Sequence, residues 1–415
     1  MTLLTTFVVL VFLHSLVSAR LERTVLTPPM VFTAAGALAF FVLPGMQEPP
    51  ASQAALLHIA EIGLVMLLFT DACRTSLQVL RHIGSLSLRL LSIGMLLTMA
   101  LGMLAALGVL PGLSIWEAAI LAAVLAPTDA GLGQVIVENP LVPLRIRQTL
   151  NVEAGLNDGL SVPFLLFFIA MAERAANADV SLGGLIGEQL GLGTLVGLGI
   201  GLGGGLLLRI ASRAKWLAHS WQQLGVVALP VLCVIACHAL HASMFIAAFV
   251  GGLAVQVRFA EAAESSIEFT EGWGRLLNLS VFFLLGLMVA RALPQFEWPH
   301  AVYAVLSLTV VRMLPVAIAL GGAKLSRATV LFMGWFGPRG LASIVLGLVY
   351  LAHEEQLAGE STIRLAVMST VALSVFAHGA SALPGIAWYA RKVAVLPPGA
   401  PEGAAGAVAA PGPHG

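Results

Sequence analysis

A short polar stretch, Glu153 to Asp158, lies where the sequence is otherwise strongly apolar, directly before the apolar run 160–172. It contains two carboxylates and the amide of Asn157. A carboxylate inside a membrane costs roughly several kcal/mol unless it is paired, hydrated or lines a pathway. Helical spacing places Glu153 and Asn157 on one face, with Asp158 about 100° further round the helix. We therefore predict that Asp158 faces a cavity and carries an ion and a proton.

The chemistry expected of Asp158 is competition between two cations. Desolvation disfavours the charged form of a buried carboxylate, so such a group takes up a proton readily near neutral pH. It can hold a proton or a monovalent cation, but not both at once. Combined with alternating access, this competition is sufficient for obligatory exchange. The alternative is that Asp158 is a hydrated loop carboxylate at the start of its span.

The composition predicts an all-α polytopic membrane protein. Of the 415 residues, 59% are hydrophobic and only 10% are charged, whereas about 25% of residues are charged in a soluble domain. Mean hydropathy is +0.95, and the 43 glycines suit close helix packing in lipid. The net charge of zero gives no indication of nucleic-acid binding. Apolar runs of about 20 residues without period-2 alternation exclude a barrel.

The apolar runs predict about thirteen transmembrane helices, the first of them an uncleaved span. Loops after the odd-numbered spans, together with the C-terminal segment, carry 16 of the 21 Lys and Arg residues. The positive-inside rule then places the N-terminus outside and the C-terminus in the cytoplasm. We expect one transmembrane domain over residues 1–392. Residues 393–415, rich in Ala, Pro and Gly, are expected to form a short disordered cytoplasmic tail.

Two of the predicted spans are interrupted by proline and glycine and contain one charged residue each. The first reads Pro127-Thr128-Asp129-Ala130-Gly131, and the second reads Gly337-Pro338-Arg339-Gly340. The two breaks lie seven spans apart. Because this offset is odd, the two interrupted spans cross the membrane in opposite directions. Residues 90–172 and 299–387 are therefore predicted to be inverted repeats with two crossing broken helices, the usual position of a transporter binding site. Two ordinary proline kinks are the alternative.

The charges at these places have separate expected roles. Asp129 can offset the positive N-terminal ends of the half-helices, and Arg339 can offset the negative C-terminal ends. The Thr128 hydroxyl and the carbonyls near it are hard oxygen donors suited to a small cation. Glu153 is expected to pair with Arg312, which lies in another apolar run, with Arg339 as the second choice. Such a pair is static, so Asp158 remains the carboxylate without a permanent counterion.

The four motifs together resemble the monovalent cation:proton antiporters, in particular the bacterial NhaP-type sodium/proton exchangers. They are Pro127-Thr128-Asp129, Glu153 with Asn157-Asp158-Gly159, Arg312 with Pro315, and Gly337-Pro338-Arg339-Gly340. The resemblance extends over about residues 5–390. It implies a thirteen-helix fold with a six-helix core, a homodimer, and elevator-like movement of the core.

The same resemblance implies roles for individual residues. Asp158 would bind the sodium or potassium ion and the proton. Thr128, Asn157 and Asp129 would be further members of the ion- and proton-binding site, with Asn157 as the structural member of the Asn-Asp pair. The Asn-Asp pair is similar to the electroneutral branch of the family. Two departures are Ala154, where the family often has Ser, and Ala130, where many relatives have Pro. The missing hydroxyl at Ala154 leaves the preference for sodium over potassium open.

Other functions were weighed against an antiporter. A channel or uniporter on a related fold would conduct the cation without moving protons. An intramembrane aspartyl protease using Asp129 and Asp158 is disfavoured because Asn157 separates the Gly-Leu pair from the second aspartate. We expect no enzyme activity and no cofactor, and we expect the substrates to be a monovalent cation and protons. The expected location is the inner membrane of a bacterial cell.

Overall fold

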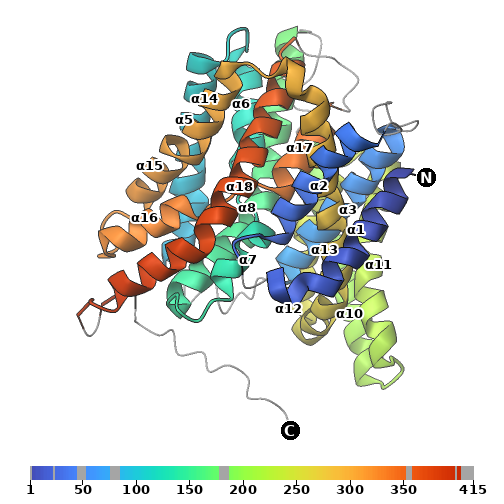
Figure 1. Cartoon of the computed structure of the whole chain (residues 1–415). Helices are drawn as coiled ribbons and strands as arrows, with labels where there is room; N and C mark the ends of the chain where they lie inside the picture. Colours follow the sequence, from blue (N-terminus) through green and yellow to red (C-terminus); the bar gives the residue numbers. More distant parts are fainter. Residues whose placement is uncertain are drawn as a thin grey trace.

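The structure of the chain is a computed structural model, and it is helical throughout the residues that it describes. These residues are 2–21, 24–43, 53–74, 85–176, 187–351, 358–397 and 400–402. Figure 1 shows the helices running in roughly parallel and antiparallel directions, as expected for a bundle that crosses a membrane. The predicted all-α class is confirmed.

The helices begin and end as follows: α1 (Thr2–Leu21), α2 (Pro28–Val42), α3 (Gln53–Arg74), α5 (Met95–Val109, after a π-helical turn Leu90–Gly94), α6 (Ile115–Leu125), α7 (Ala130–Val137), α8 (Leu144–Ala176), α10 (Gly193–Arg213, after a π-helical turn Gly187–Leu192), α11 (His219–Leu240), α12 (Met244–Arg258), α13 (Ala260–Ala292, followed by a 3₁₀ turn Leu293–Gln295), α14 (Trp298–Leu308), α15 (Val310–Ala319), α16 (Arg327–Trp335), α17 (Leu341–Leu351) and α18 (Glu360–Val393).

Within the described residues, nine helical segments are long and apolar enough to cross a membrane, and two shorter helices, α2 and α12, are also apolar. The broken helix α16–α17 and helix α3 are not among these nine segments. The membrane-protein class is therefore confirmed, and the count of thirteen spans stays a prediction.

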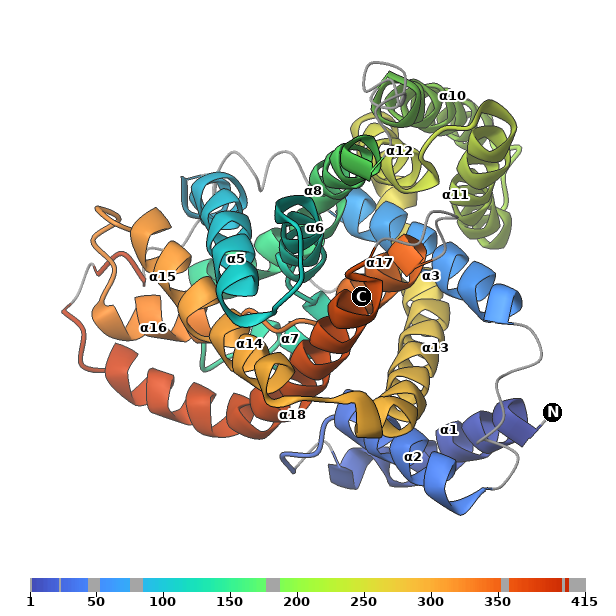
Figure 2. The same ribbon diagram turned by 90° about the horizontal axis from the view of Figure 1, so that it is seen from above.

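Seen from above, the helices form two groups that lie side by side (Figure 2). One group contains α5 to α8 and α14 to α18, and the other contains α1 to α3 and α10 to α13. Helices α3, α12 and α13 of the second group contact α8, α17 and α18 of the first. Every polar site residue predicted from the sequence belongs to the first group.

The first group consists of two copies of one arrangement. In each copy an apolar helix is followed by a broken helix and then by a long helix. The first copy is α5, α6 with α7, and α8, and the second is α14 with α15, α16 with α17, and α18. The long helices have 33 and 34 residues, so each extends beyond the membrane core. The predicted inverted repeats and the two crossing broken helices are confirmed.

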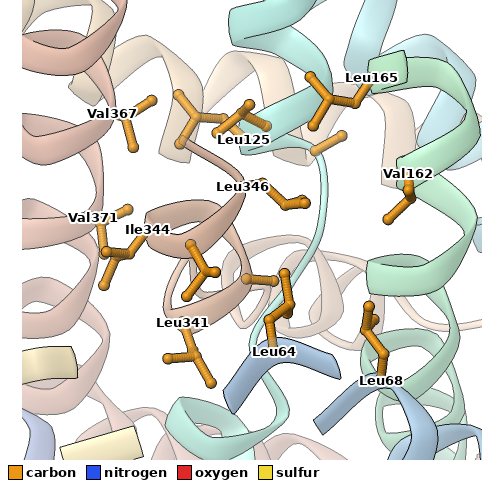
Figure 3. Packing of buried hydrophobic residues seen from close by; sticks show 14 of the residues in the cluster. Leu64, Leu68, Leu125, Val162, Leu165, Leu341, Ile344, Leu346, Val367 and Val371 are labelled. Atoms are coloured by element: carbon orange, nitrogen blue, oxygen red, sulfur yellow. The ribbon is translucent and has the colours of Figure 1, made fainter. Parts of the chain in front are cut away.

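A dry hydrophobic layer lies on one side of the crossing and holds the half-helices against their neighbours. Figure 3 shows the apolar side chains of this layer, which come from α3, α6, α8, α17 and α18. The labelled members are Leu64, Leu68, Leu125, Val162, Leu165, Leu341, Ile344, Leu346, Val367 and Val371. Apolar packing of this kind excludes water, which strengthens electrostatic interactions among the polar groups beside it.

The end of the chain differs from the predicted disordered tail at residues 400–402. The Glu402 side chain is only 2% exposed. Its Oε1 atom accepts hydrogen bonds from the Ser326 amide at 2.7 Å and the Thr329 hydroxyl at 2.9 Å. Arg145, in the first turn of α8, donates to the Pro401 carbonyl at 2.7 Å. The composition of this segment does not indicate that it is held in place, because the contacts with Ser326 and Thr329 depend on the single carboxylate of Glu402.

Glu402 completes a cap that the sequence of α16 lacks. At the matching end of α6, Ser114 and Glu117 form a capping box in which the carboxylate accepts from the N-cap amide. At α16 the N-cap is Ser326, and the third helical position is Thr329, which is too short to reach back. Glu402 supplies the missing carboxylate from the far end of the chain.

Glu402→Ala should therefore destabilise the protein by about 1 kcal/mol, as the loss of an N-cap does. Burial raises the pKa of Glu402, but hydrogen bonds from Ser326 and Thr329 outweigh it, so the pKa lies below its ordinary value. A lowered pKa contributes stability above the pKa of the unfolded chain, and this stability is lost as the pH falls through the folded value. Thermal unfolding in detergent should show an acid-side fall that Glu402→Gln reduces. Equal profiles for Glu402→Gln and the exposed control Glu138→Gln would contradict the cap.

Candidate ion-binding site

The polar stretch of α8 is buried. Glu153 is 2% exposed, and Asn157 and Asp158 are each 3% exposed. The next residue, Gly159, lies directly against the ring of Phe249 on α12, where a side chain at position 159 would collide with it. Asp158 is therefore held at the contact between the two groups of helices and is not a hydrated loop residue.

The first broken helix crosses the second at Asp129. The Asp129 amide donates to the Pro338 carbonyl at 2.8 Å. Its carboxylate accepts from the Leu132 amide at 2.8 Å and from the Leu341 amide at 2.5 Å. These two amides belong to the first turns of α7 and α17, so one carboxylate caps the N-terminal ends of both half-helices. Helix N-termini carry partial positive charge, which a buried carboxylate offsets.

Arg339 has the complementary position and is completely buried. Its Nη1 atom donates to the carbonyls of Ala126 at 2.9 Å and Pro127 at 3.1 Å, which are exposed by the end of α6. The half-helix ends that face each other therefore receive one fixed negative and one fixed positive side chain. Gly340 lies tightly against the Asp129 carboxylate, which leaves no room for a side chain at that position.

Glu153 and Arg312 form a buried ion pair between α8 and α15. Arg312 Nη1 lies 2.6 Å from Glu153 Oε1, and Arg312 Nη2 lies 3.0 Å from Oε2, so the pair is bidentate. Gly337 packs on the guanidinium of Arg312, which links the pair to the second break. Breaking such a pair leaves an uncompensated buried charge, so it serves as a fixed part of the structure.

Asn157 and Asp158 differ from the carboxylates of Asp129 and Glu153, whose oxygens accept hydrogen bonds from fixed partners. Asn157 Nδ2 donates to Thr128 Oγ1 at 2.7 Å, which joins α8 to the first break. Asp158 Oδ1 and Asn157 Oδ1 are buried, and no residue that the structure describes donates a hydrogen bond to either oxygen. Buried polar atoms normally have partners. Two buried oxygens beside a hydroxyl make an arrangement that can receive a cation or a proton.

A small cavity lies between the first break and the start of α8, and neither Asn157 nor Asp158 is among the residues that line it. That Asp158 faces a cavity stays a prediction. Thr128, Asp129, Glu153 and Ala154 line its inner part. Its outer part is lined by Ile136, Val137, Leu150 and Phe336, among others. The volume of about 20 Å³ is sufficient for a water molecule. Ala154 presents only a methyl group to this cavity, at the position where a serine would present a hydroxyl.

Asp71 on α3 joins the site, although its sequence position near the end of an apolar run suggested an interfacial residue. The structure buries it to 4% exposure. Its Cβ lies 3.9 Å from the place that a side chain on Gly155 of α8 would occupy. Asp71 and Asp129 are both close enough to Asp158 for their charges to interact with it. The signal that could have identified Asp71 is its charge inside an apolar run.

This fold and this site define a membrane transporter for a charged substrate, and comparison with known proteins defines the family. A sequence model of the family described as "Sodium/hydrogen exchanger, transmembrane" matches residues 7–388. The chain therefore belongs to the transmembrane sodium/hydrogen exchanger family.

Curated relatives are about a quarter identical to this chain over the aligned residues. It is 26% identical over 293 residues to the K(+)/H(+) antiporter NhaP of Alkalimonas amylolytica, covering 70% of this chain and 50% of that protein. It is 27% identical over 344 residues to the K(+)/H(+) antiporter NhaP2 of Shewanella sp. strain ANA-3, covering 81% and 58%. The chain thus spans about half the length of the curated relatives that it matches.

The fold is similar to that of a solved transporter. The structure of the sodium proton antiporter MjNhaP1 from Methanocaldococcus jannaschii at pH 8 superposes with a TM-score of 0.72. The match covers 94% of this chain and 99% of that one, at 20% sequence identity. This likeness establishes the architecture of the exchanger fold over nearly the whole chain.

Loss of one partner of the Glu153–Arg312 pair should destabilise the protein strongly. Glu153→Gln leaves the Arg312 guanidinium buried without its counter-charge, at an expected cost of about 3–5 kcal/mol. The double variant Glu153→Gln, Arg312→Gln removes both charges and should recover part of the loss. Thermal unfolding in detergent measures both effects, with the exposed Glu138→Gln as control. A double variant no more stable than Glu153→Gln would show that the buried charge is not the cause.

Proposed function

We propose that this protein is a secondary antiporter that exchanges a monovalent cation for protons. The observation that carries the proposal is the contrast among the buried charges of the crossing. Asp129, Arg339, Glu153 and Arg312 each have fixed partners within the protein. Asp158 has a buried oxygen to which no described residue donates. It is therefore the charge that exchanges its partner.

Exchange follows from what Asp158 can hold. With a proton, the side chain is neutral and is stable in a dry site. With a bare negative charge it is stable only when a cation replaces the proton, because an uncompensated buried carboxylate is costly. The empty charged state is thus disfavoured, and the site changes sides of the membrane with one of its two substrates bound. This coupling is what distinguishes an antiporter from a channel.

The proposed cation ligands are oxygen atoms from helix α8 and from the first break. They are the Asp158 carboxylate, the Thr128 hydroxyl beside the first break and the free amide oxygen of Asn157. Asp71 adds negative charge from α3 on the other group of helices. We assign Asp129 to capping the half-helices, because its two carboxylate oxygens both accept main-chain hydrogen bonds. One cation for one proton at a single carboxylate makes the proposed exchange electroneutral.

The cation itself is proposed as sodium or potassium. The two curated relatives described above are named potassium/proton antiporters, and the solved relative is named a sodium proton antiporter. Ala154 removes one hydroxyl from the cavity wall, which favours a site less selective for the smaller, more strongly hydrated sodium ion. We propose that both ions are transported.

We propose the inner membrane of a bacterial cell as the location, with the N-terminus outside and the C-terminus in the cytoplasm. The distribution of Lys and Arg supports this orientation. We also propose a homodimer in the lipid bilayer. Its support is the second group of helices, where α1 has exposed apolar residues along its length, including Leu4, Val8, Phe12 and Leu16.

Asp158→Asn should abolish exchange, because the amide can neither bind a proton at this site nor balance a cation. In everted membrane vesicles, sodium or potassium added to the wild type should dissipate a proton gradient reported by a pH-sensitive dye. The variant should show at least about a hundredfold lower rate at equal expression, which corresponds to roughly 2.7 kcal/mol. Glu138→Gln is the matched control at an exposed carboxylate. Exchange by Asp158→Asn would refute the mechanism, and cation flux without proton movement in the wild type would indicate a channel.

Ala154→Ser should shift the ion preference toward sodium. The new hydroxyl would line the cavity beside Thr128 and supply one more hard oxygen ligand, worth about 1 kcal/mol or several-fold in affinity. We expect the KM for sodium to fall several-fold relative to the KM for potassium in the same vesicle assay. Ala154→Gly, which adds no ligand, is the control. Equal changes in the two KM values would contradict a coordinating role at position 154.

A further inference from the structure

The second break leaves main-chain polar groups that must find partners away from α16 and α17. One is the Trp335 carbonyl at the end of α16, and another is the Arg339 amide just before α17. Both lie in the buried centre of the first group of helices. An unpaired main-chain group in such a place costs several kcal/mol. Within the break, the Trp335 carbonyl accepts from the Gly337 amide at 2.9 Å. Helix α18 gives this carbonyl a second contact and supplies the partner of the Arg339 amide.

Two side chains one turn apart on α18 make these contacts. Ser374 is completely buried and His378 is 3% exposed. The Arg339 amide donates to Ser374 Oγ at 2.7 Å. His378 Nε2 lies 2.9 Å from the Trp335 carbonyl oxygen, and His378 Nδ1 lies 3.1 Å from Ser374 Oγ. Neither residue belongs to one of the four sequence motifs, and the exchange mechanism does not use them.

The chemistry of the partners determines where the protons lie. A carbonyl oxygen only accepts, so His378 Nε2 carries a proton and donates it to Trp335. In the neutral ring, Nδ1 then accepts from the Ser374 hydroxyl, which itself accepts from Arg339. A continuous chain of hydrogen bonds therefore joins the two sides of the break. The Ser374 carbonyl oxygen also lies 3.0 Å from Nδ1 and would accept a proton only from the charged ring.

Two arginines and a tryptophan lie around His378. Arg339 precedes α17, Arg312 comes from α15, and both place positive charge near His378. Trp335 also packs its ring on the imidazole, with 5.0 Å between ring centroids, and its Nε1 donates to Ser381 Oγ at 2.9 Å. His378 is thus held on both sides, by the Trp335 carbonyl at Nε2 and by Ser374 at Nδ1.

The position of Arg339 connects this series of hydrogen bonds to the cation site. While Ser374 holds the Arg339 main chain, the Arg339 side chain holds the carbonyls of Ala126 and Pro127. The next residue is Thr128, whose hydroxyl is a proposed cation ligand. A shift of the break at Trp335 to Arg339 would therefore displace Thr128 relative to Asp158.

We propose that His378 and Ser374 form a latch through which α18 positions Arg339, and with it the Thr128 side of the cation site. His378 is then a positioning residue for exchange that touches neither substrate. This inference rests on the proposed antiport function, because it assigns a role in binding the transported cation.

Two substitutions at His378 separate the roles of its nitrogens. His378→Gln places an amide nitrogen where Nε2 lies and can still donate to the Trp335 carbonyl. His378→Asn is too short to reach Trp335 and keeps polar atoms only near Nδ1. Ser374→Ala removes the other half of the latch. Ser381→Ala is the matched control, because it removes a hydrogen bond of the Trp335 ring one turn further along α18 and leaves the main-chain contacts of the break in place.

The measurement is the KM for sodium and the maximal rate of cation-dependent proton flux per folded protein in everted vesicles. We expect His378→Asn and Ser374→Ala to raise KM about tenfold, with a smaller change in the maximal rate. We expect His378→Gln to stay within about threefold of the wild type and Ser381→Ala to match it. A tenfold change is the effect of misplacing about one hydrogen-bonded ligand.

Each outcome decides the proposal. Unchanged KM values in His378→Asn and Ser374→Ala, an equal rise in Ser381→Ala, or a fall in maximal rate alone would overturn the positioning role. If both latch variants fail to fold while Ser381→Ala folds normally, the latch serves folding only and the proposal is wrong. A wild-type protein without cation-dependent proton flux would instead refute the proposed function on which this inference rests.

Discussion

The crossing of two broken helices at Asp129 is the constraint on which the rest of the structure depends. Each break exposes helix ends to a low-dielectric interior, where their partial charges are expensive. One carboxylate caps the N-terminal ends of α7 and α17, and one guanidinium, that of Arg339, binds the carbonyl end of α6. Once these bonds are made, the unwound segments can remain inside the bundle without water. The main chain of the unwound segment then lies beside Thr128 and forms part of the proposed cation site.

The same constraint divides the buried charges into two classes. Charges that stabilise the architecture have fixed partners, as in the bidentate pair of Glu153 and Arg312. A charge that transports must lack such a partner, and Asp158 retains an oxygen that no described residue contacts. The two classes must stay separate, because a fixed partner of Asp158 would hold the carboxylate in one protonation or ion-bound state and stop the exchange.

The architecture could be predicted from the sequence to a large extent, because the membrane restricts the possibilities. Long apolar runs in lipid must be helices, and proline with a charge in two matched runs indicates paired breaks. The pairing of Glu153 with Arg312 followed from the same logic, since a buried charge needs an opposite one. These predictions rely on local composition and on charge balance, both of which a single sequence displays.

Contacts between distant segments could not be predicted in this way. Asp71 resembles an interfacial residue until α3 is packed against α8. His378 and Ser374 look like two ordinary polar residues in the last span, and their role depends on which break α18 faces. Glu402 lies in a segment whose composition indicates disorder, yet one carboxylate finds the uncapped end of α16. In each case the partner lies far away in the sequence, and tertiary packing alone brings the two together.

The dependence of the KM for the cation on pH tests most directly whether proton and cation compete at Asp158. If they do, the KM for sodium or potassium in everted vesicles should rise about tenfold for each unit that the pH falls below the range where Asp158 loses its proton. The maximal rate at saturating cation should remain nearly constant over the same range. A KM that does not change with pH while exchange continues would show that the two ions bind at separate sites, and it would contradict the competition mechanism.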